Sequence, residues 1–342
     1  MKIKNTEEEF FNVCNTKNID DEVEKLFLYF RDKGFPNYDI NNYCPTTELE
    51  KLKKFNDKTI FVSGSIKQTM HSLGFLWCFF PHWVDVKYKN QKLGLLDLWN
   101  NDEKLKVLIK KTYKWQLKFG NGVFTINRLR QNSKIYLNKQ SVSNFRPTSA
   151  KYFYNKYGNN GVVWDMCAGW GGRLFGFLSS NCNTYIGTEP CEKTYNGLIE
   201  LKNIFRKESK RINIYNLCAE DHILDKESVD LCFTSPPYFD CERYSKEITQ
   251  SYIKHPTKEL WLDNFLRKMI RNCYYCLKDN GYMILNIANT PQHKWIEDSV
   301  LNISELENFK LIETNYLNLS SVSGKGIKRE PIFVFKKNNK IK

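Results

Sequence analysis

The chain has 342 residues, 41% hydrophobic and 15% aromatic, a composition typical of a globular protein with two domains or with one large domain and an extension. No run approaches the roughly 18 apolar residues of a membrane span, and the polar, acidic N-terminus is unlike a signal peptide. Eleven scattered cysteines are typical of reduced thiols, so we expect a protein of the bacterial cytoplasm or, if the protein is viral, of the host cytoplasm. The net charge of +14 favours a polyanionic partner over a membrane.

The first 140 residues (1–140) are expected to form an N-terminal α+β extension. Residues 20–33 predict a helix with acidic residues in its first turn and Gly34 after its end. Residues 59–88 are rich in aromatic and β-forming residues. Residues 101–119 predict an amphipathic helix with apolar residues at helical spacing. The other face of this helix carries Lys104, Lys106, Lys110, Lys111, Lys114 and Lys118.

Positive charge is concentrated in one part of this extension. Residues 86–140 hold thirteen Lys or Arg against three Asp or Glu, a net charge of +10. Such a stretch can be no more than a solvated surface, or it can contact a polyanion. Both interpretations stay open at this point.

Residues 141–342 are expected to form a second domain in which strands and helices alternate. Alternation of this kind is typical of a sheet covered by helices on both faces. The last two predicted strands can form a hairpin. We therefore predict an α/β fold with a doubly wound, seven-stranded, mostly parallel, Rossmann-like sheet. The predicted strands are 161–166, 183–188, 211–216, 229–234, 281–287, 309–318 and 331–336, and the predicted helices are 172–180, 192–208 and 258–278.

Residues that could bind a ligand or take part in a reaction follow four consecutive predicted strands. The first strand runs into a glycine turn, the second ends at an acid, the third leads to an acid pair, and the fourth ends in a stiff proline loop. In a doubly wound sheet the carboxyl ends of the strands form the ligand crevice. The turn lacks the regular G-x-G-x-x-G spacing of dinucleotide binders. The residues in order are Asp165, Cys167, Gly169, Gly171, Gly172; Glu189; Glu220, Asp221; and Thr234, Ser235, Pro236, Pro237, Tyr238.

This ordered set resembles the S-adenosylmethionine-dependent DNA amino-methyltransferases, which methylate N4 of cytosine or N6 of adenine. The resemblance covers roughly residues 144–338, and the Ser-Pro-Pro-Tyr loop is its most specific part. It implies a methyltransferase sheet, S-adenosyl-L-methionine as cofactor and duplex DNA with a flipped base as partner. It also implies that Asp165, Cys167, Thr234 and the glycines hold the methionine end, that Glu189 binds the ribose hydroxyls and that Glu220 or Asp221 lies beside the adenine. The segment before the glycine strand, with Phe145, is expected to pack on the cofactor.

The proline loop suits attack by a poorly nucleophilic amine. The lone pair of an exocyclic amine is delocalised into the base, and an acceptor for its protons helps the nitrogen to become pyramidal. The Ser235 hydroxyl and the Pro236 carbonyl can serve as acceptors, with Pro237 fixing their direction. Tyr238 offers a face for stacking on a flipped base and for developing positive charge. Direct transfer of this kind requires no metal and no covalent intermediate.

Three other cysteine or histidine patterns are weaker candidates. Cys191 follows a proline, as in cytosine-C5 methyltransferases, but after the second strand instead of the fourth. Cys273 and Cys276 form a C-x-x-C pair on the apolar face of a predicted helix, without a second pair for zinc. His82 has Cys78 nearby, which is too few ligands for a site. We interpret all of them as packing residues.

Site-specific DNA methylation on an exocyclic amine is thus the expected activity. Ser before Pro-Pro-Tyr slightly favours cytosine N4 over adenine N6. The alternatives are an RNA base-amine methyltransferase and a non-catalytic DNA-binding protein on a methyltransferase fold. The lysine-rich extension is expected to position DNA. The absence of a nuclease-like acid/Lys cluster suggests a stand-alone modification enzyme of the restriction–modification type.

Overall fold

The computed structural model describes residues 18–89, 93–119, 124–136, 142–320 and 327–338. The chain forms two compact units, of which the first comprises residues 1–43 and 81–142 and the second residues 44–80 and 143–342. These units do not follow a single division at residue 140, because residues 44–80 pack with the second unit. Among the described residues, no helix is both long enough and apolar enough to cross a membrane.

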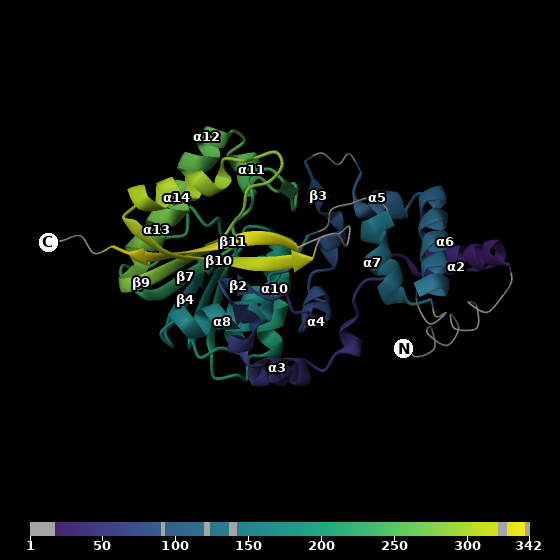
Figure 1. The fold of residues 1–342 in the computed structure, drawn as a ribbon, viewed down its shortest axis with the longest axis horizontal. Coiled ribbons are helices and arrows are strands. Elements are labelled where there is room, and N and C mark those ends of the chain that lie inside the picture. The colour runs from purple at the N-terminus through teal and green to yellow at the C-terminus, as the bar shows by residue number, and fades with distance from the viewer. Residues whose placement is uncertain (1–17, 90–92, 120–123, 137–141, 321–326, 339–342) are drawn as a thin grey trace. The chain divides into compact units, whose positions relative to one another are not determined.

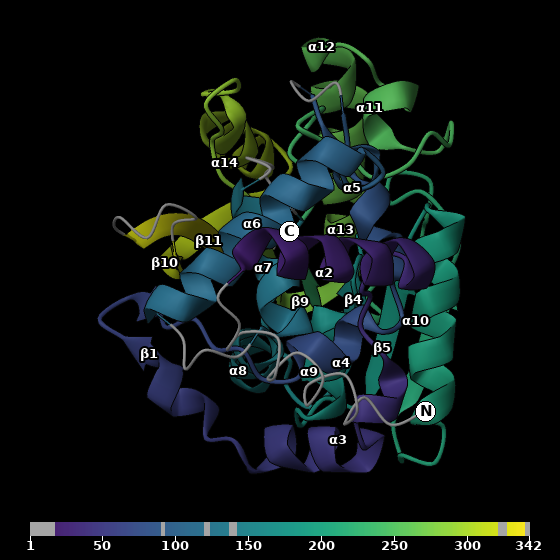
Figure 2. The same cartoon turned by 90° about the vertical axis from the view of Figure 1, so that its right-hand side faces the viewer.

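The first unit is a small helical body. Helix α2 packs on α6, and α6 packs on α7 (Figure 2). Asn18 caps α2 by accepting from the N–H of Asp20, and acidic residues occupy its first turn. Phe30, Leu108 and Tyr113 are among the buried residues of its core. Its elements are α2 (Ile19–Lys33), η1 (Ile40–Asn42), η3 (Pro81–Asp85), β3 (Lys87–Tyr88), α5 (Leu95–Trp99), α6 (Asp102–Phe119) and α7 (Ile126–Tyr136).

The lysine face of α6 is partly neutralised within the first unit. Lys106 Nζ lies 2.7 Å from Glu24 Oε2, and Lys110 Nζ lies 2.6 Å from Asp20 Oδ1. Both acids belong to α2. These two lysines of the predicted face are therefore paired with the acidic helix that precedes them in the chain. Lys114 and Lys118 are exposed.

The second unit is built on a mixed sheet with the strand order β1-β2-β10-β11-β9-β7-β4-β5-β6. Strands β4, β5, β6, β7 and β9 run parallel to one another, and β11 is antiparallel to both β9 and β10. The seven predicted strands and the final hairpin are confirmed. The strands of this sheet are β1 (Phe61–Val62), β2 (Ser65–Ile66), β4 (Val162–Asp165), β5 (Thr184–Thr188), β6 (Arg211–Tyr215), β7 (Val229–Thr234), β9 (Leu277–Asn286), β10 (Phe309–Ser320) and β11 (Ile327–Lys337). The short strand β8 (Glu242–Arg243) lies outside it.

Helices cover both faces of this sheet, with α8 on one side and α13 and α14 on the other (Figure 1). Phe153 and Tyr154 of α8 pack on Phe233 of β7. On the opposite face, Met269 and Val300 belong to a buried apolar cluster with the strands. The helices are α3 (Pro45–Lys54), η2 (Asp57–Ile60), α4 (Leu73–Trp77), α8 (Pro147–Tyr157), α9 (Gly172–Leu178), α10 (Glu192–Ile204), α11 (Ser251–Lys254), α12 (Lys258–Leu260), the π-helical η4 (Trp261–Arg267), α13 (Lys268–Cys276) and α14 (Ile296–Leu306).

The segment before residue 81 contains less strand than its composition indicates. Only β1 and β2 form there, with two residues each, and residues 73–77 form helix α4. The Phe75 ring packs on Phe175 after the glycine turn and on Phe205 after α10. Aromatic residues therefore serve here as a helical cover for the second unit.

Lys151 of α8 joins this early segment to the rest of the second unit. Its Nζ donates to the carbonyl oxygens of Leu52 (2.9 Å), Lys53 (2.8 Å) and Phe55 (2.8 Å). The last carbonyls of a helix lack partners within the helix. A cation at that end is also favoured by the helix dipole. Lys151 thus caps the C-terminus of α3.

Candidate active site

A cavity of about 200 Å³ opens at the carboxyl ends of the parallel strands of the second unit. Nine of the predicted site residues line it, and they come from the segment before α8 and from the ends of β4, β5, β6 and β7. These residues are Phe145, Cys167, Gly169, Glu189, Glu220, Ser235, Pro236, Pro237 and Tyr238. The residues predicted for the site but absent from its lining are Asp165, Gly171, Gly172, Asp221 and Thr234.

The glycines of the turn after β4 have different surroundings. Gly169 has φ +56°, and a Cβ placed there would meet only the Cys167 carbonyl oxygen, at 3.8 Å. This position favours glycine through its backbone conformation and leaves space in the cavity. At Gly172 a Cβ would lie 2.0 Å from the Phe145 carbonyl oxygen. Gly172 therefore allows the turn to pack closely against the segment that carries Phe145.

Asp165 is the centre of a buried polar network beneath the turn. Its Oδ2 accepts from Arg173 Nε (2.9 Å) and from the Tyr185 hydroxyl (2.8 Å), and its Oδ1 accepts from Thr234 Oγ1 (2.8 Å). Thr234 Oγ1 also accepts the N–H of Cys167 (3.0 Å). Asp165 and Thr234 thus tie the turn after β4 to the loop after β7. Their contacts hold these two segments of the site in place.

Glu189 is a buried carboxylate in the cavity wall. Its Oε2 accepts the N–H of Gly169 (2.9 Å), and its Oε1 accepts the N–H of Cys191 (3.0 Å). Burial raises the pKa of Glu189 to about 7, although these two donors act in the opposite direction. The side chain that the sequence assigns to ribose hydroxyls is therefore held beside the glycine turn.

The two acids after β6 have different exposures. Glu220 is buried and lines the cavity, and its Oε1 accepts from Lys254 Nζ (2.9 Å) and lies 3.0 Å from His255 Nε2. Asp221 is exposed and also accepts from Lys254. Of the two acids that the sequence offered for the adenine, Glu220 is the one in the cavity.

The loop after β7 presents the Ser235 hydroxyl to the cavity with its proton already engaged. Ser235 Oγ donates to the Asn286 carbonyl oxygen at 2.9 Å. A hydroxyl has one proton and two lone pairs, so this oxygen remains able to accept. The Tyr238 hydroxyl donates to Glu330 Oε2 of β11 at 3.4 Å. Burial raises the pKa of Tyr238 well above its usual range, so the hydroxyl stays protonated.

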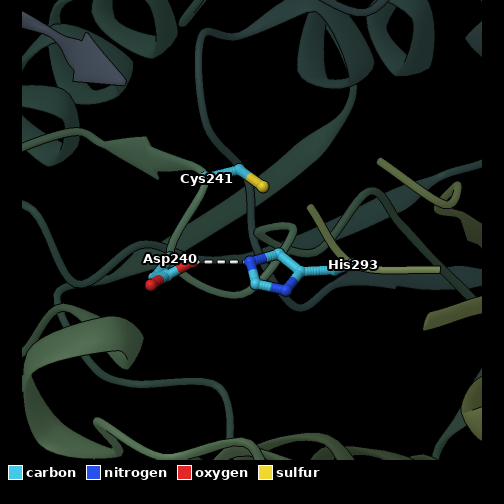
Figure 3. Close-up of side chains that lie close together, drawn as sticks. All are labelled: Asp240, Cys241 and His293. Atoms are coloured by element: carbon cyan, nitrogen blue, oxygen red, sulfur yellow. Dashed lines mark hydrogen bonds and ion pairs between the residues drawn. The ribbon is translucent and has the colours of Figure 1, made fainter. Parts of the chain in front are cut away.

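Asp240, Cys241 and His293 lie together behind this loop (Figure 3). His293 Nε2 lies 2.7 Å from Asp240 Oδ1, and Cys241 Sγ donates to Thr290 Oγ1 at 3.4 Å. Phe239, just before this group, has φ +57°. The three ligand atoms are within 4.8 Å of one another, close enough to hold a metal ion. In this structure the acid–imidazole contact fixes the end of the loop, and the expectation that no metal takes part stays a prediction.

Several cavity residues were not assigned from the sequence. Asn144 donates from Nδ2 to the Trp170 carbonyl (2.6 Å) and accepts the N–H of Gly172 at Oδ1 (3.1 Å). Arg146 is 8% exposed, and its Nε has no hydrogen-bond partner among the described residues. Burial lowers the pKa of Arg146 to about 10. Both residues stand in the segment that the sequence singled out for Phe145, but only the fold indicates their contacts. No local sequence pattern assigned Gln250 or Glu330 to the cavity.

Of the residues interpreted as packing residues, Cys191, Cys273 and Cys276 are buried, whereas Cys78 and His82 are partly exposed. Cys191 is the residue before α10 and does not line the cavity. Cys273 and Cys276 lie in the apolar cluster with α13, and Cys276 Sγ lies 3.8 Å from Cys232 Sγ. Burial raises the pKa of the Cys273 thiol. Buried thiols with a raised pKa are poor nucleophiles.

The sheet order and the cavity at its strand ends define the class: an α/β protein with a doubly wound, mostly parallel, Rossmann-like sheet, as predicted. Known structures of similar fold include an S-adenosylmethionine-dependent methyltransferase from Methanosarcina mazei, with 11% identity, a TM-score of 0.39 and coverage of 54% of this chain and 95% of that chain. An S-adenosylmethionine-dependent O-methyltransferase from Thermotoga maritima shares 13% identity, with a TM-score of 0.39 and coverage of 61% and 72%. No curated protein has a significant match.

The C-terminal part of the chain matches a protein-family model. Residues 229–342 match the model of the N6/N4 DNA methylase family, described as DNA methylase. The matched residues include the loop from Thr234 to Tyr238, whereas the glycine turn and Glu189 precede them. Over these residues the match agrees with the resemblance to the S-adenosylmethionine-dependent DNA amino-methyltransferases.

Proposed function

We propose that this protein transfers a methyl group from S-adenosylmethionine to the exocyclic amine of a flipped base in duplex DNA, with cytosine N4 favoured over adenine N6. One observation carries the proposal: Gly169, Glu189 and Ser235 line the same cavity. A cofactor seated on the first two residues would share a crevice with the group that receives the base amine. The preference for cytosine rests only on Ser235 standing where adenine enzymes more often have Asp or Asn.

The residues of the cavity fit an S-adenosyl cofactor. Gly169 leaves open space beside its backbone, and Glu189 offers buried carboxylate oxygens for a ribose diol. The Arg146 guanidinium suits the carboxylate of the methionine end, because a buried cation with an unpartnered N–H favours a charged acceptor. The bound cofactor would supply an electrophilic methyl group on its sulfonium. Asp165 and Thr234 would not contact the cofactor but would hold the glycine turn in position.

The loop after β7 would receive the base. Because the only hydroxyl proton of Ser235 is engaged in a hydrogen bond to the Asn286 carbonyl, the Ser235 oxygen can accept a hydrogen bond from an N–H of the base amine. The Pro236 carbonyl is a second acceptor, and the adjacent Pro237 limits the loop's freedom. Tyr238, held by Glu330, would stack on the base. The chain's residues thereby orient the amine lone pair, with no covalent intermediate.

The experiment that tests this function combines methyl-labelled S-adenosylmethionine and purified protein with mixed-sequence duplex DNA in one reaction and with tRNA in a second, followed by mass spectrometry of the nucleosides. We expect N4-methylcytosine. N6-methyladenine would overturn the choice of base, and label in tRNA but not in DNA would favour the RNA alternative. Binding of cofactor and DNA without any transfer would favour the non-catalytic alternative.

Two variants test the role of the loop. Ser235→Ala should lower kcat by about a hundredfold or more, since it removes an acceptor used in the transition state, while cofactor affinity stays unchanged. Tyr238→Ala should lower transfer and leave cofactor affinity intact. Ser228→Ala is the control, because Ser228 donates to the Asp225 carbonyl away from the cavity lining. Full activity of Ser235→Ala would contradict the proposed acceptor.

A further inference from the structure

Three side chains of different metal-binding types converge behind the loop after β7 (Figure 3). They are Asp240, Cys241 and His293, and their ligand atoms all lie within 4.8 Å of one another. Asp240 and Cys241 belong to the end of that loop, whereas His293 follows β9, the strand beside β7 in the sheet. None of these three residues lines the cavity at the strand ends. The group is therefore separate from the candidate active site.

The backbone around these side chains holds two of them in place. Cys241 closes a turn in which its N–H donates to the Tyr238 carbonyl at 3.3 Å. His293 closes a second turn, in which its N–H donates to Thr290 Oγ1 at 3.1 Å and the Thr290 N–H donates to the His293 carbonyl at 3.0 Å. The imidazole also packs on the Phe239 ring, with centroids 5.2 Å apart. Side chains on supported segments lose little freedom when they bind an ion, which favours tight binding.

The spacing of the ligand atoms fits a tetrahedral ion after one small movement. Zinc lies about 2.3 Å from a thiolate sulfur and about 2.0–2.2 Å from an imidazole nitrogen or a carboxylate oxygen. In a tetrahedral arrangement these bond lengths place neighbouring ligand atoms about 3.3–3.7 Å apart. His293 Nε2 and Asp240 Oδ1 lie 2.7 Å apart, so this pair has to separate by roughly 0.6–0.7 Å. Rotation of the Asp240 carboxylate can supply such a shift.

The combination of ligand atoms selects zinc. Thiolates favour zinc, copper(I) and iron–sulfur clusters, and imidazoles favour zinc, copper, iron and nickel. Zinc also binds carboxylate oxygens, so it accepts all three kinds of side chain that meet here. Three protein ligands leave a fourth position of the tetrahedron for water.

A second group with similar spacing already contains a cation. Cys218, Glu220 and Asp221 also place their ligand atoms within 4.8 Å of one another. However, Lys254 Nζ lies 2.9 Å from Glu220 Oε1 and pairs with Asp221 as well. An ammonium group between two carboxylates supplies the positive charge that a metal ion would bring. The group that contains His293 is therefore the stronger candidate for a metal site.

We propose that Asp240, Cys241 and His293 bind a zinc ion that fastens the loop after β7 to the segment after β9. The Cys241 thiol releases its proton to solvent as the zinc–sulfur bond forms. The ion joins the two segments at one point, and the hydrogen bond from Ser235 to the Asn286 carbonyl joins them at another. This role is structural: the ion takes no part in the transfer step, and the proposal does not depend on the proposed function.

The first test is a titration of the full chain with cobalt(II) chloride, after bound metals have been removed with a chelator. Cobalt(II) can replace zinc in tetrahedral sites, and its bond to a thiolate gives a charge-transfer absorption in the near ultraviolet. We expect this absorption to reach its maximum at one equivalent of cobalt and to disappear when zinc chloride is added. Absence of the absorption would overturn the proposal.

Two variants of nearly unchanged shape assign the absorption to this group. Cys241→Ser should abolish it. Asp240→Asn should weaken zinc binding by about tenfold or more, since even the loss of an outer partner of a metal ligand costs about 10–100-fold. Cys218→Ser is the matched control, because it removes the thiol of the other group and should change neither result. An absorption that survives in Cys241→Ser, or that is lost in Cys218→Ser, would place the cobalt elsewhere and refute the assignment.

Thermal melting distinguishes a metal site from a simple hydrogen-bonded pair. Zinc that binds only the folded chain raises its Tm. We expect a higher Tm with zinc chloride than with chelator in the unchanged chain and in Cys218→Ser, but not in Cys241→Ser. The transition measured with chelator also verifies that each variant folds. If zinc leaves the Tm of the unchanged chain unaltered, His293 and Asp240 form only a hydrogen bond and the proposal fails, whereas the proposed transfer reaction is unaffected.

Discussion

The Glu189 carboxylate combines burial with two main-chain donors, from Gly169 and Cys191. An ordinary glutamate titrates near 4.5, whereas Glu189 titrates at about 7 in the free protein. Between pH 4.5 and about pH 7 the Glu189 carboxyl group is therefore largely neutral when no cofactor is bound. Ribose hydroxyls donate to the ionised form, so cofactor binding would release a proton in this range.

Cofactor affinity should therefore depend on pH through Glu189. The dissociation constant of S-adenosylhomocysteine should fall as pH rises toward 7, by up to roughly tenfold per unit, and level off above it. Calorimetry in buffers of different ionisation enthalpy would also measure the released proton. Glu189→Gln should bind more weakly and lose this dependence. An unchanged pH profile in that variant would exclude Glu189 as its source.

The buried pair of Arg173 and Asp165 should contribute strongly to stability. Arg173→Leu leaves the Asp165 carboxylate buried without its cation, which costs about 3–5 kcal/mol of the free energy of unfolding. Urea unfolding measures the change. Arg271→Leu is a matched control, because Arg271 pairs with Glu307 at an exposed position and should cost less than about 1 kcal/mol. Equal effects in the two variants would contradict a special role for the buried pair.

At the scale of elements, helix α6 is the surface on which DNA positioning can be tested. Lys106 and Lys110 already pair with acids of α2, so the exposed Lys114 and Lys118 are the lysines to change. Their joint replacement by Glu should weaken DNA binding severalfold and reduce its salt dependence. Cofactor affinity should stay unchanged.

The control for this prediction reverses two exposed lysines of the second unit. Lys193→Glu/Lys207→Glu makes the same change in net charge at positions 193 and 207. Binding measured by fluorescence anisotropy at two salt concentrations separates a local contact from the effect of total charge. Equal weakening by both pairs of substitutions would show that only total charge matters.

Local patterns predicted much of the second unit because its strands and turns have strong local signals. The run 229–234 and the prolines after it define β7 and its loop, and the glycines after Asp165 define the turn. The pairing of Lys106 with Glu24 could not be predicted, because it depends on how two helices distant in sequence pack. The contact of Arg173 with Asp165 and the convergence of Cys241 and His293 likewise arise only from the tertiary structure.

At the scale of the whole molecule, the second unit includes residues 44–80, which precede the predicted domain boundary at residue 141. Phe75 covers Phe175 and Phe205, and Lys151 donates to three carbonyls of residues 52–55. A fragment of residues 141–342 would expose these aromatic rings and leave a buried ammonium without its partners. It should aggregate or unfold without cooperativity in calorimetry, unlike the full chain. A sharp, reversible transition of the fragment would contradict this view of the unit.

Lys151 also sets an order of events during synthesis. Its acceptors are separated from it by 96 to 99 positions along the chain. As the nascent polypeptide leaves the ribosome, the end of α3 must stay uncapped until a hundred further codons have been read. Because translation proceeds at about 5–20 residues per second, this early helix lacks its lysine cap for roughly 5–20 s. A chaperone that shields such a segment would be most needed in that interval.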